Sequence, residues 1–424
     1  MMATTLTRQD SRFYIHTLPN GLQMLGQLIP GMQSAAAVFW VCTGTRDEQQ
    51  EQMGVSHFLE HMAFRRTQRI GGKVDRLFEE MGADHNAATW LEMTFYWARV
   101  LAENVDKAID VLTDLTRPVL DAEDFDQERN VILEEIARYE DIPTHVLLSH
   151  FMWDFFGDHP LAWETLGTSG SIRELRVEQM RDYWARRYGS RNVIFAIAGN
   201  FDWDAVVAQV EMLTSDWKPG ETGRTALPAS FRPASHVYHV PKFTQEQIAI
   251  GTPTVARDDP RYFASAVLAT ILGDDTGSRL YWALYHTGLA ESASAQPMQF
   301  EDNGLLLVHI ATEPGKAAKA LDAVRSELDR LQSFDVSDDE LARAKAKLTS
   351  SVIIGGESTN DRMMSLIRSW LSRGKLETLE ELRHEIESVT IEDLRALVHS
   401  YPVSPDQVIT AVGPLPDGEL QAAG

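Results

Sequence analysis

The sequence predicts an α+β protein made of two homologous domains. An internal repeat is the first indication, because residues 177–201 return weakly as residues 390–415 at a constant offset of 214 positions. Each copy has the pattern of an amphipathic helix, a short turn and an apolar strand that ends at a glycine. The order of elements is the second indication, since short strands come early in each half and long helices follow.

A stretch dense in Pro, Gly, Ser and Thr at 216–236 is predicted to join the two domains. The N-terminal domain is therefore expected over 1–215 and the C-terminal domain over 237–424. A chain of 424 residues with 44% apolar content has ample material for two cores. Its single cysteine excludes an internal disulfide framework.

The first half opens with three predicted strands, at 12–18, 22–29 and 35–43. Residues 19–21, Pro-Asn-Gly, supply a turn between the first two strands. A helix that carries a metal-binding pattern is expected after the third strand.

That pattern is the string His57-Phe58-Leu59-Glu60-His61. Residues four positions apart lie on one face of a helix, so the imidazoles of His57 and His61 can bind one tetrahedral Zn²⁺. Glu60 borders the ion without having to bind it, and its carboxylate can take a proton from a zinc-bound water. The order His-x-x-Glu-His is the inverse of the commoner His-Glu-x-x-His and is called the inverzincin motif.

A third ligand is expected from residues 121–141, which have the pattern of an acidic amphipathic helix with Asp121 as its N-cap. Glu128 and Glu135 are seven positions apart and share a face of this helix. Two His and one Glu leave a fourth position open for water, as in catalytic zinc sites. Glu134 is adjacent but points about 100° away, so we expect it on a solvated face.

The region from 44 to 140 resembles the pitrilysin (insulinase) family of zinc metallopeptidases, in the subfamily of mitochondrial processing peptidase and its bacterial relatives. The matching strings lie in the family's order and with family-like spacing, at 44–48, 54–64, 82–96 and 128–141. This agreement is far more specific than the five-residue motif alone.

The resemblance implies a role for several residues. It makes Glu135 the third zinc ligand, and it makes Glu128 a catalytic carboxylate that orients a His ligand. It also assigns the binding of the substrate backbone to Asn86 and Ala87. The second half has no His-x-x-Glu-His and no other cluster of ligands, so one Zn²⁺ per chain is expected.

The implied fold is the clamshell-forming metallopeptidase fold. Each domain would be a mixed β-sheet of about six strands backed by α-helices, and two chains would pair to enclose a chamber. A homodimer is expected, with a heterodimer that contains a metal-free homologue as the alternative.

The implied function is zinc-dependent hydrolysis of short or unfolded peptides, with Glu60 as the general base. Substrate is expected to bind as an added strand along a sheet edge near 84–92, with Asn86 holding its backbone. Two alternatives stay open. The chain could be active only beside a separate partner chain, or it could be a non-catalytic scaffold subunit.

One departure from the family lies at 278–294. The family carries an Arg and a Tyr that touch substrate carbonyls, but here Tyr285 stands about where the Arg would be and Glu291 replaces the Tyr. A carboxylate would repel a developing oxyanion. Tyr285 is therefore the predicted substrate-binding residue, with Tyr281, His286 or a partner chain as alternatives.

The net charge of −23 argues against binding to nucleic acid or to anionic membrane surfaces. It is compatible with basic peptide substrates, and equally with acidity that only keeps the protein in solution. The N-terminal residues lack the apolar core of a signal peptide and the Arg-rich character of a transit peptide. No stretch approaches 18 uncharged apolar residues, so a cytoplasmic protein without a membrane span is expected.

Overall fold

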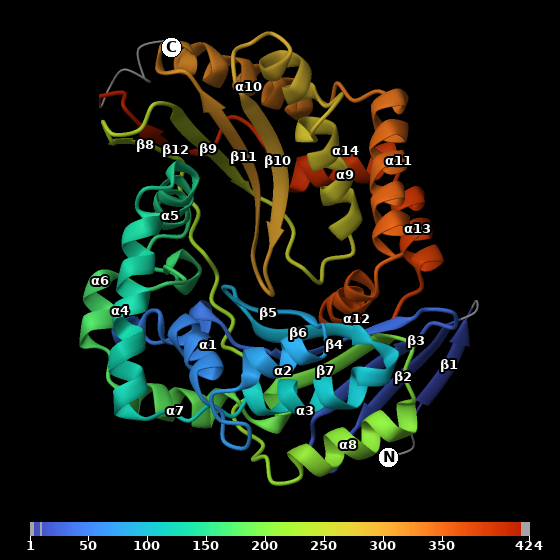
Figure 1. Cartoon of the computed structure of the whole chain (residues 1–424). Helices are drawn as coiled ribbons and strands as arrows, with labels where there is room; N and C mark the ends of the chain where they lie inside the picture. The colour runs from blue at the N-terminus through green and yellow to red at the C-terminus, as the bar shows by residue number, and fades with distance from the viewer. Residues whose placement is uncertain (1–3, 9–10, 417–424) are drawn as a thin grey trace. The chain divides into compact units, whose positions relative to one another are not determined.

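A computed structural model describes residues 4–8 and 11–416, and the chain folds into two compact units (Figure 1). Neither unit is a continuous piece of the chain. The first unit consists of Met1–Ala137, Trp163–Thr225 and Ile354–Thr378. The second unit consists of Arg138–Ala162, Ala226–Ile353 and Leu379–Gly424.

The first unit contains a mixed sheet with strand order β1-β2-β3-β7-β4-β6-β5. Its strands are β1 (Thr4–Arg8), β2 (Ser11–Thr17), β3 (Gln23–Leu28), β4 (Ser34–Val41), β5 (Asp84–Thr89), β6 (Thr94–Leu101) and β7 (Val193–Gly199). The pair β3–β7 is parallel, and the other neighbours are antiparallel. β5 is therefore an edge strand that pairs with β6 on one side.

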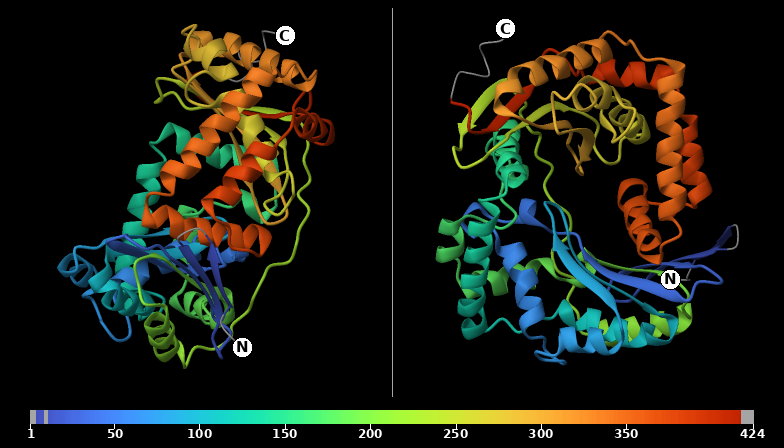
Figure 2. Two further views of the ribbon diagram at one scale, coloured as in Figure 1. Left: turned by 90° about the vertical axis from the view of Figure 1, so that its right-hand side faces the viewer. Right: turned by 45° about the horizontal axis from the view of Figure 1, so that its top comes forward.

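Helices cover both faces of this sheet (Figure 2). The helices of the first unit are α1 (Val55–Arg65), α2 (Val74–Glu80), α3 (Val105–Leu115), α4 (Ala122–Tyr139), α6 (Ser169–Glu174), α7 (Val177–Arg187), α8 (Trp203–Thr214) and α12 (Thr359–Arg373). Because both faces are covered, β4 reads as an almost continuous apolar run, in which Phe39 packs with one core and Val38 with the other. α12 covers the face that contains Val38.

The second unit repeats this arrangement with strand order β10-β11-β9-β12-β8. Its strands are β8 (Ala234–His239), β9 (Glu246–Pro253), β10 (Ser292–Gln299), β11 (Gly304–Thr312) and β12 (Val408–Gly413). Its helices are α5 (Pro143–Phe156), α9 (Tyr262–Gly273), α10 (Ala317–Gln332), α11 (Asp338–Gly355), α13 (Leu379–Ser388) and α14 (Ile391–Ser400), with a π-helical turn η6 at Tyr281–Tyr285.

The two sheets share a five-strand pattern. Read from its opposite end, the second sheet matches β3-β7-β4-β6-β5, and it has one parallel pair, β12–β8, at the corresponding place. The predicted repeat underlies this match, since α7 and β7 precede α14 and β12 by the same offset, and both strands end at glycine. The predicted α+β class with two homologous mixed-sheet domains is confirmed, with seven and five described strands instead of about six each.

The compact units are divided differently from the predicted domains 1–215 and 237–424. Residues 354–378, from the second half of the sequence, belong to the first unit, and residues 138–162 belong to the second. The predicted linker 216–236 contains one of the boundaries between the units, after Thr225. The prediction followed the duplication along the sequence, whereas the units follow the packing of apolar helix faces.

Among the helices of the described residues, none has the length and the apolar character that a membrane span requires.

Candidate metal centre

The helix that carries the candidate ligands, α1, is held at its N-terminus by a buried carboxylate. Gly54 precedes the helix with φ +93°, and a Cβ there would lie 2.7 Å from the carbonyl oxygen of Leu166. The Oε2 and Oε1 atoms of Glu48 accept hydrogen bonds from the backbone N–H groups of Gly54 and Ser56, both at 2.7 Å. Two N–H groups at the start of α1 are thereby satisfied.

Three candidate ligands meet between α1 and α4. One donor atom each from His57, His61 and Glu135 lies within 4.8 Å of the other two. The Oε2 atom of Glu135 is 3.4 Å from Nε2 of His61 and 3.8 Å from Nε2 of His57. Glu134 is exposed, in agreement with the prediction that it lies on a solvated face.

This donor set fits zinc. Two imidazole nitrogens and one carboxylate oxygen make up a common catalytic zinc site, and ligands about 2.1 Å from a tetrahedral ion lie about 3.4 Å apart. The distances from Glu135 to the two imidazoles are close to that value. Burial, together with the neighbouring His61, lowers the pKa of His57 to about 3. His57 is therefore a neutral imidazole at pH 7, which is the form that binds metal.

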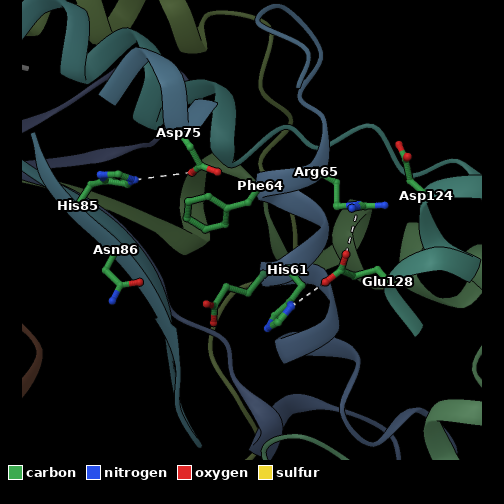
Figure 3. Close-up of a pocket in the computed structure, with 9 residues that line it drawn as sticks. His61, Phe64, Arg65, Asp75, His85, Asn86, Asp124 and Glu128 are labelled. Atoms are coloured by element: carbon green, nitrogen blue, oxygen red, sulfur yellow. Dashed lines mark hydrogen bonds and ion pairs between the residues drawn. The ribbon is translucent and has the colours of Figure 1, made fainter. Parts of the chain in front are cut away.

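Glu128 orients His61 (Figure 3). Its Oε1 atom lies 2.9 Å from Nδ1 of His61, and its Oε2 atom lies 3.3 Å from Nε of Arg65. Burial lowers the pKa of His61, but the hydrogen bond to Glu128 and the charges of nearby carboxylates outweigh it, so the pKa is raised. With Nδ1–H donating to Glu128, the lone pair of Nε2 faces Glu135 and is available to a metal.

Glu60 lies beside the cluster but is not part of it. Its Oε2 atom accepts a hydrogen bond from the Thr89 hydroxyl at 2.6 Å. Burial raises the pKa of Glu60, although this hydrogen bond lowers it. Glu60 lines a pocket of about 580 Å³, whose lining residues are drawn in Figure 3. The lining residues are Glu60, His61, Phe64, Arg65, Asp75, His85, Asn86, Asp124 and Glu128.

Asn86 and Ala87 lie in the edge strand β5. Asn86 is exposed and lines the pocket, and its Oδ1 atom accepts a hydrogen bond from the N–H of Ala87 at 2.8 Å. The side chain of Ala87 is buried, so only its backbone is available to a ligand. On the neighbouring position of β5, His85 stacks on Phe78 and approaches Asp75 at 3.7 Å.

Tyr285 belongs to the second unit, in the turn η6. It is 55% exposed and stacks on Tyr281, with ring centroids 5.4 Å apart. His286 packs against Trp282, and Glu291 accepts a hydrogen bond from Gln245. Among the residues that the structure describes, the second unit has no cluster of three metal-binding side chains.

Three residues near the cluster, Thr89, Arg65 and Glu48, received no role from the sequence. Arg65 is four residues after His61, a spacing that predicts a shared helix face. Thr89 is two residues after Ala87, so both side chains point to the same side of β5. Spacing therefore indicates the faces on which Arg65 and Thr89 lie, whereas the contact of Glu48 with the start of α1 depends on how residues 49–53 fold.

Comparison with known proteins assigns this duplicated fold, with its His-His-Glu cluster, to a family. The profile of the insulinase family (peptidase family M16) matches residues 25–169, and that of the peptidase M16 inactive domain matches residues 174–348. This chain belongs to the insulinase, or pitrilysin, family, as its motifs predicted.

Relatives cover almost the whole chain. A Streptomyces coelicolor protein named as an uncharacterized zinc protease is 33% identical over 419 residues, which are 95% of this chain and 89% of that protein. The probable mitochondrial-processing peptidase subunit beta of Arabidopsis thaliana is 28% identical over 95% of this chain and 78% of that protein. The crystal structure of a protease from Helicobacter pylori shares the fold, with a TM-score of 0.87 and 21% identity over 96% of this chain and 100% of that one.

Proposed function

We propose that this protein is a zinc-dependent endopeptidase that cuts short or unfolded peptides. The convergence of His57, His61 and Glu135, with Glu60 beside them, is the observation that supports the proposal most directly. Zinc held by these residues would polarise the scissile carbonyl group and acidify a water molecule. The names of the relatives, which describe zinc proteases, agree with this chemistry.

The protein's own residues would then move one proton. Glu60 would accept it from the attacking water and later pass it to the leaving amine. A raised pKa suits a carboxylate that must both accept and donate near neutral pH, and burial raises the pKa of Glu60. Glu128 would keep His61 in the tautomer and orientation that leave Nε2 available.

The edge strand β5 would bind the substrate backbone. β5 pairs with β6 on one side, so its other side can accept an extended peptide as a further strand. Asn86 lines the adjoining pocket and could donate its side-chain amide to a substrate carbonyl. Pairing between backbones depends little on the side chains of the peptide. We therefore expect the site to select extended peptides more than a particular sequence.

A second candidate is a zinc subunit that works only with a metal-free partner chain. Glu291, which stands where the family has a tyrosine, accepts a hydrogen bond from Gln245 and cannot donate one to an oxyanion. Tyr285 is exposed in the second unit and stays the predicted substrate-binding residue of the chain itself. Gel filtration of the pure chain, together with an assay of its peptidase activity, distinguishes these alternatives. An active homodimer would argue against the need for a partner chain.

A cytoplasmic location stays a prediction.

Metal analysis and peptide cleavage by the wild type, Glu60→Gln and Glu134→Gln test the main proposal. The wild type and both variants should contain about one zinc ion per chain. Glu60→Gln should lose activity by about 10²–10⁴-fold, as expected for removal of a general base. Glu134→Gln is the control, because Glu134 is exposed and neighbours a ligand. A wild type without zinc, or a Glu60→Gln variant as active as the wild type, would refute the proposal and favour the scaffold alternative.

A further inference from the structure

The edge strand β5 is connected to the candidate base by one side chain. Thr89, the last residue of β5, donates its hydroxyl to Oε2 of Glu60 at 2.6 Å. Among the described residues, this is the hydrogen bond that the Glu60 carboxylate makes, and α1 supplies none of its own. The position of the carboxylate therefore depends on a strand that is distant from α1 in the sequence.

A glutamate on a helix needs such a contact to be well oriented. The helix fixes the Cα–Cβ direction, but the two outer side-chain torsions stay free to rotate unless packing or a hydrogen bond restricts them. A bond to Oε2 restricts both torsions, and it leaves Oε1 as the oxygen that can receive a proton. An orientation that is set before substrate binds does not have to be reached at the moment of reaction.

The same strand carries the residues that would bind substrate. Side chains alternate along β5, so Asn86 and Thr89 point to opposite sides of the strand although they are only three residues apart. Asn86 lines the pocket, whereas Thr89 reaches the carboxylate of α1. A peptide that pairs with β5 is thereby placed relative to Glu60 through one short, hydrogen-bonded segment.

We propose that Thr89 is a positioning residue, which holds Glu60 and fixes its distance from a peptide bound along β5. This inference rests on the proposed function. A residue of the candidate substrate-binding strand would thus hold the general base in place. The hydroxyl of Thr89 would act through Glu60 without touching the reacting atoms.

Thr89→Val and Thr89→Ser test the proposal. Valine keeps the branched shape that suits a strand and removes the hydroxyl, whereas serine keeps the hydroxyl. We expect Thr89→Val to lower kcat by about 10–100-fold, the range for a lost hydrogen bond to a charged group, with KM changed by less than about twofold. Thr89→Ser should recover most of kcat, and zinc content should not change.

Thr94→Val is the matched control. Thr94 pairs with Thr89 across the β5–β6 hairpin, but its hydroxyl donates to the carbonyl oxygen of Thr43. The Thr94→Val variant should keep the kcat of the wild type. In a Glu60→Gln background, Thr89→Val should have no further effect, since a residue that acts through Glu60 cannot act without it.

Crystal structures of the variants supply a readout that does not need activity. In the Thr89→Val structure, the Glu60 carboxylate should shift or occupy more than one position. In the Thr89→Ser structure, it should keep the position that it has in the wild type. An unchanged kcat in Thr89→Val, an equal loss in the Glu60→Gln background, or an unchanged Glu60 position would each overturn the inference. A wild type that binds no zinc and cuts no peptide would instead refute the proposed function, while the position of Glu60 in the variants would still decide the role of Thr89.

Discussion

At the scale of single residues, Arg65 connects the end of α1 to the carboxylate that orients a candidate ligand. Its Nε atom lies 3.3 Å from Oε2 of Glu128, whose other oxygen contacts His61. Glu128 is buried, and a buried carboxylate is costly unless a cation or several hydrogen bonds compensate it. Arg65 therefore supplies a cation beside the second oxygen of Glu128 and helps to hold this side chain toward His61.

We predict that Arg65→Met weakens zinc binding by about 10-fold or more, as loss of a partner behind a ligand usually does. Methionine keeps most of the apolar stem and removes the guanidinium. Competition with a chromophoric chelator measures the affinity. Arg76→Met is the control, because Arg76 forms an exposed ion pair with Glu80. Equal zinc affinities of Arg65→Met and the wild type would contradict this role.

Glu246 in the second unit gives a pH-dependent contribution to stability. It is buried at the start of β9, where Oε2 accepts a hydrogen bond from the N–H of Leu415 at 3.2 Å. Burial raises its pKa from 4.5 to about 7, although the backbone hydrogen bond lowers it. The folded state therefore holds a proton that the unfolded state releases between pH 4.5 and 7.

This difference in proton binding sets the direction of the pH dependence. The stabilisation from Glu246 is complete below pH 4.5, and it is lost as the pH rises through about 7. Glu246→Gln should remove this dependence while keeping an acceptor for Leu415. Urea unfolding measures the free energy of unfolding at pH 5 and at pH 8. Between these two pH values, the free energy of unfolding of the wild type should fall by about 1–2 kcal/mol more than that of the variant. A constant difference between the two proteins over this range would contradict the assignment.

At the scale of elements, the start of α1 depends on a residue outside the helix. Glu48 satisfies the N–H groups of Gly54 and Ser56, and Ser56 Oγ lies 2.7 Å from the hydroxyl of Tyr183 on α7. Two anchors thus hold the first turn of the helix immediately before His57. These contacts restrain the first turn of α1 and, with it, the backbone of His57.

We predict that Glu48→Ala lowers the free energy of unfolding by about 1–3 kcal/mol, since it leaves two buried N–H groups without their acceptor. The loss should be larger for the zinc-loaded protein, because a frayed first turn also misplaces His57. Thermal unfolding with and without zinc measures both effects. Glu51→Ala, at an exposed position of the same segment, should change neither.

Elements with a regular pattern were predicted closely. The helix expected at 121–141 extends from Ala122 to Tyr139, and its Glu128 and Glu135 face α1 as the seven-residue spacing implies. The strands expected at 12–18, 22–29 and 35–43 are also present, within one or two residues. These predictions succeeded because helix and strand periodicity are local properties of the chain.

At the scale of the whole molecule, each half of the sequence contributes a helix to the unit formed mainly by the other half. Residues 354–378 contain α12, whose Leu366 and Ile367 pack on the sheet face that includes Val38 and Trp40. Without α12 this face of the first sheet would lose its apolar cover. The stability of the first unit therefore depends on a segment far along the sequence.

We predict that Leu366→Ala destabilises the first unit by about 2–5 kcal/mol, the usual range for a buried leucine. Amide hydrogen exchange should become faster in β3, β4 and β7, which α12 covers, and should stay unchanged in β9 and β11. Leu268→Ala, in the core of the second unit, should give the opposite pattern. Equal effects on both sheets would show that the division into units does not describe the cooperativity of the protein.

The sequence by itself determined the family, the α+β class and the faces on which His57, His61 and Glu135 lie, because these follow from local spacing and from matching motifs. Only the tertiary structure decided which partners those faces meet. The bond from Thr89 to Glu60, the contact of Arg65 with Glu128 and the packing of α12 on the first sheet join residues that are far apart in the sequence. Spacing cannot place such residues together, because long-range contacts depend on how all the apolar surfaces pack at once.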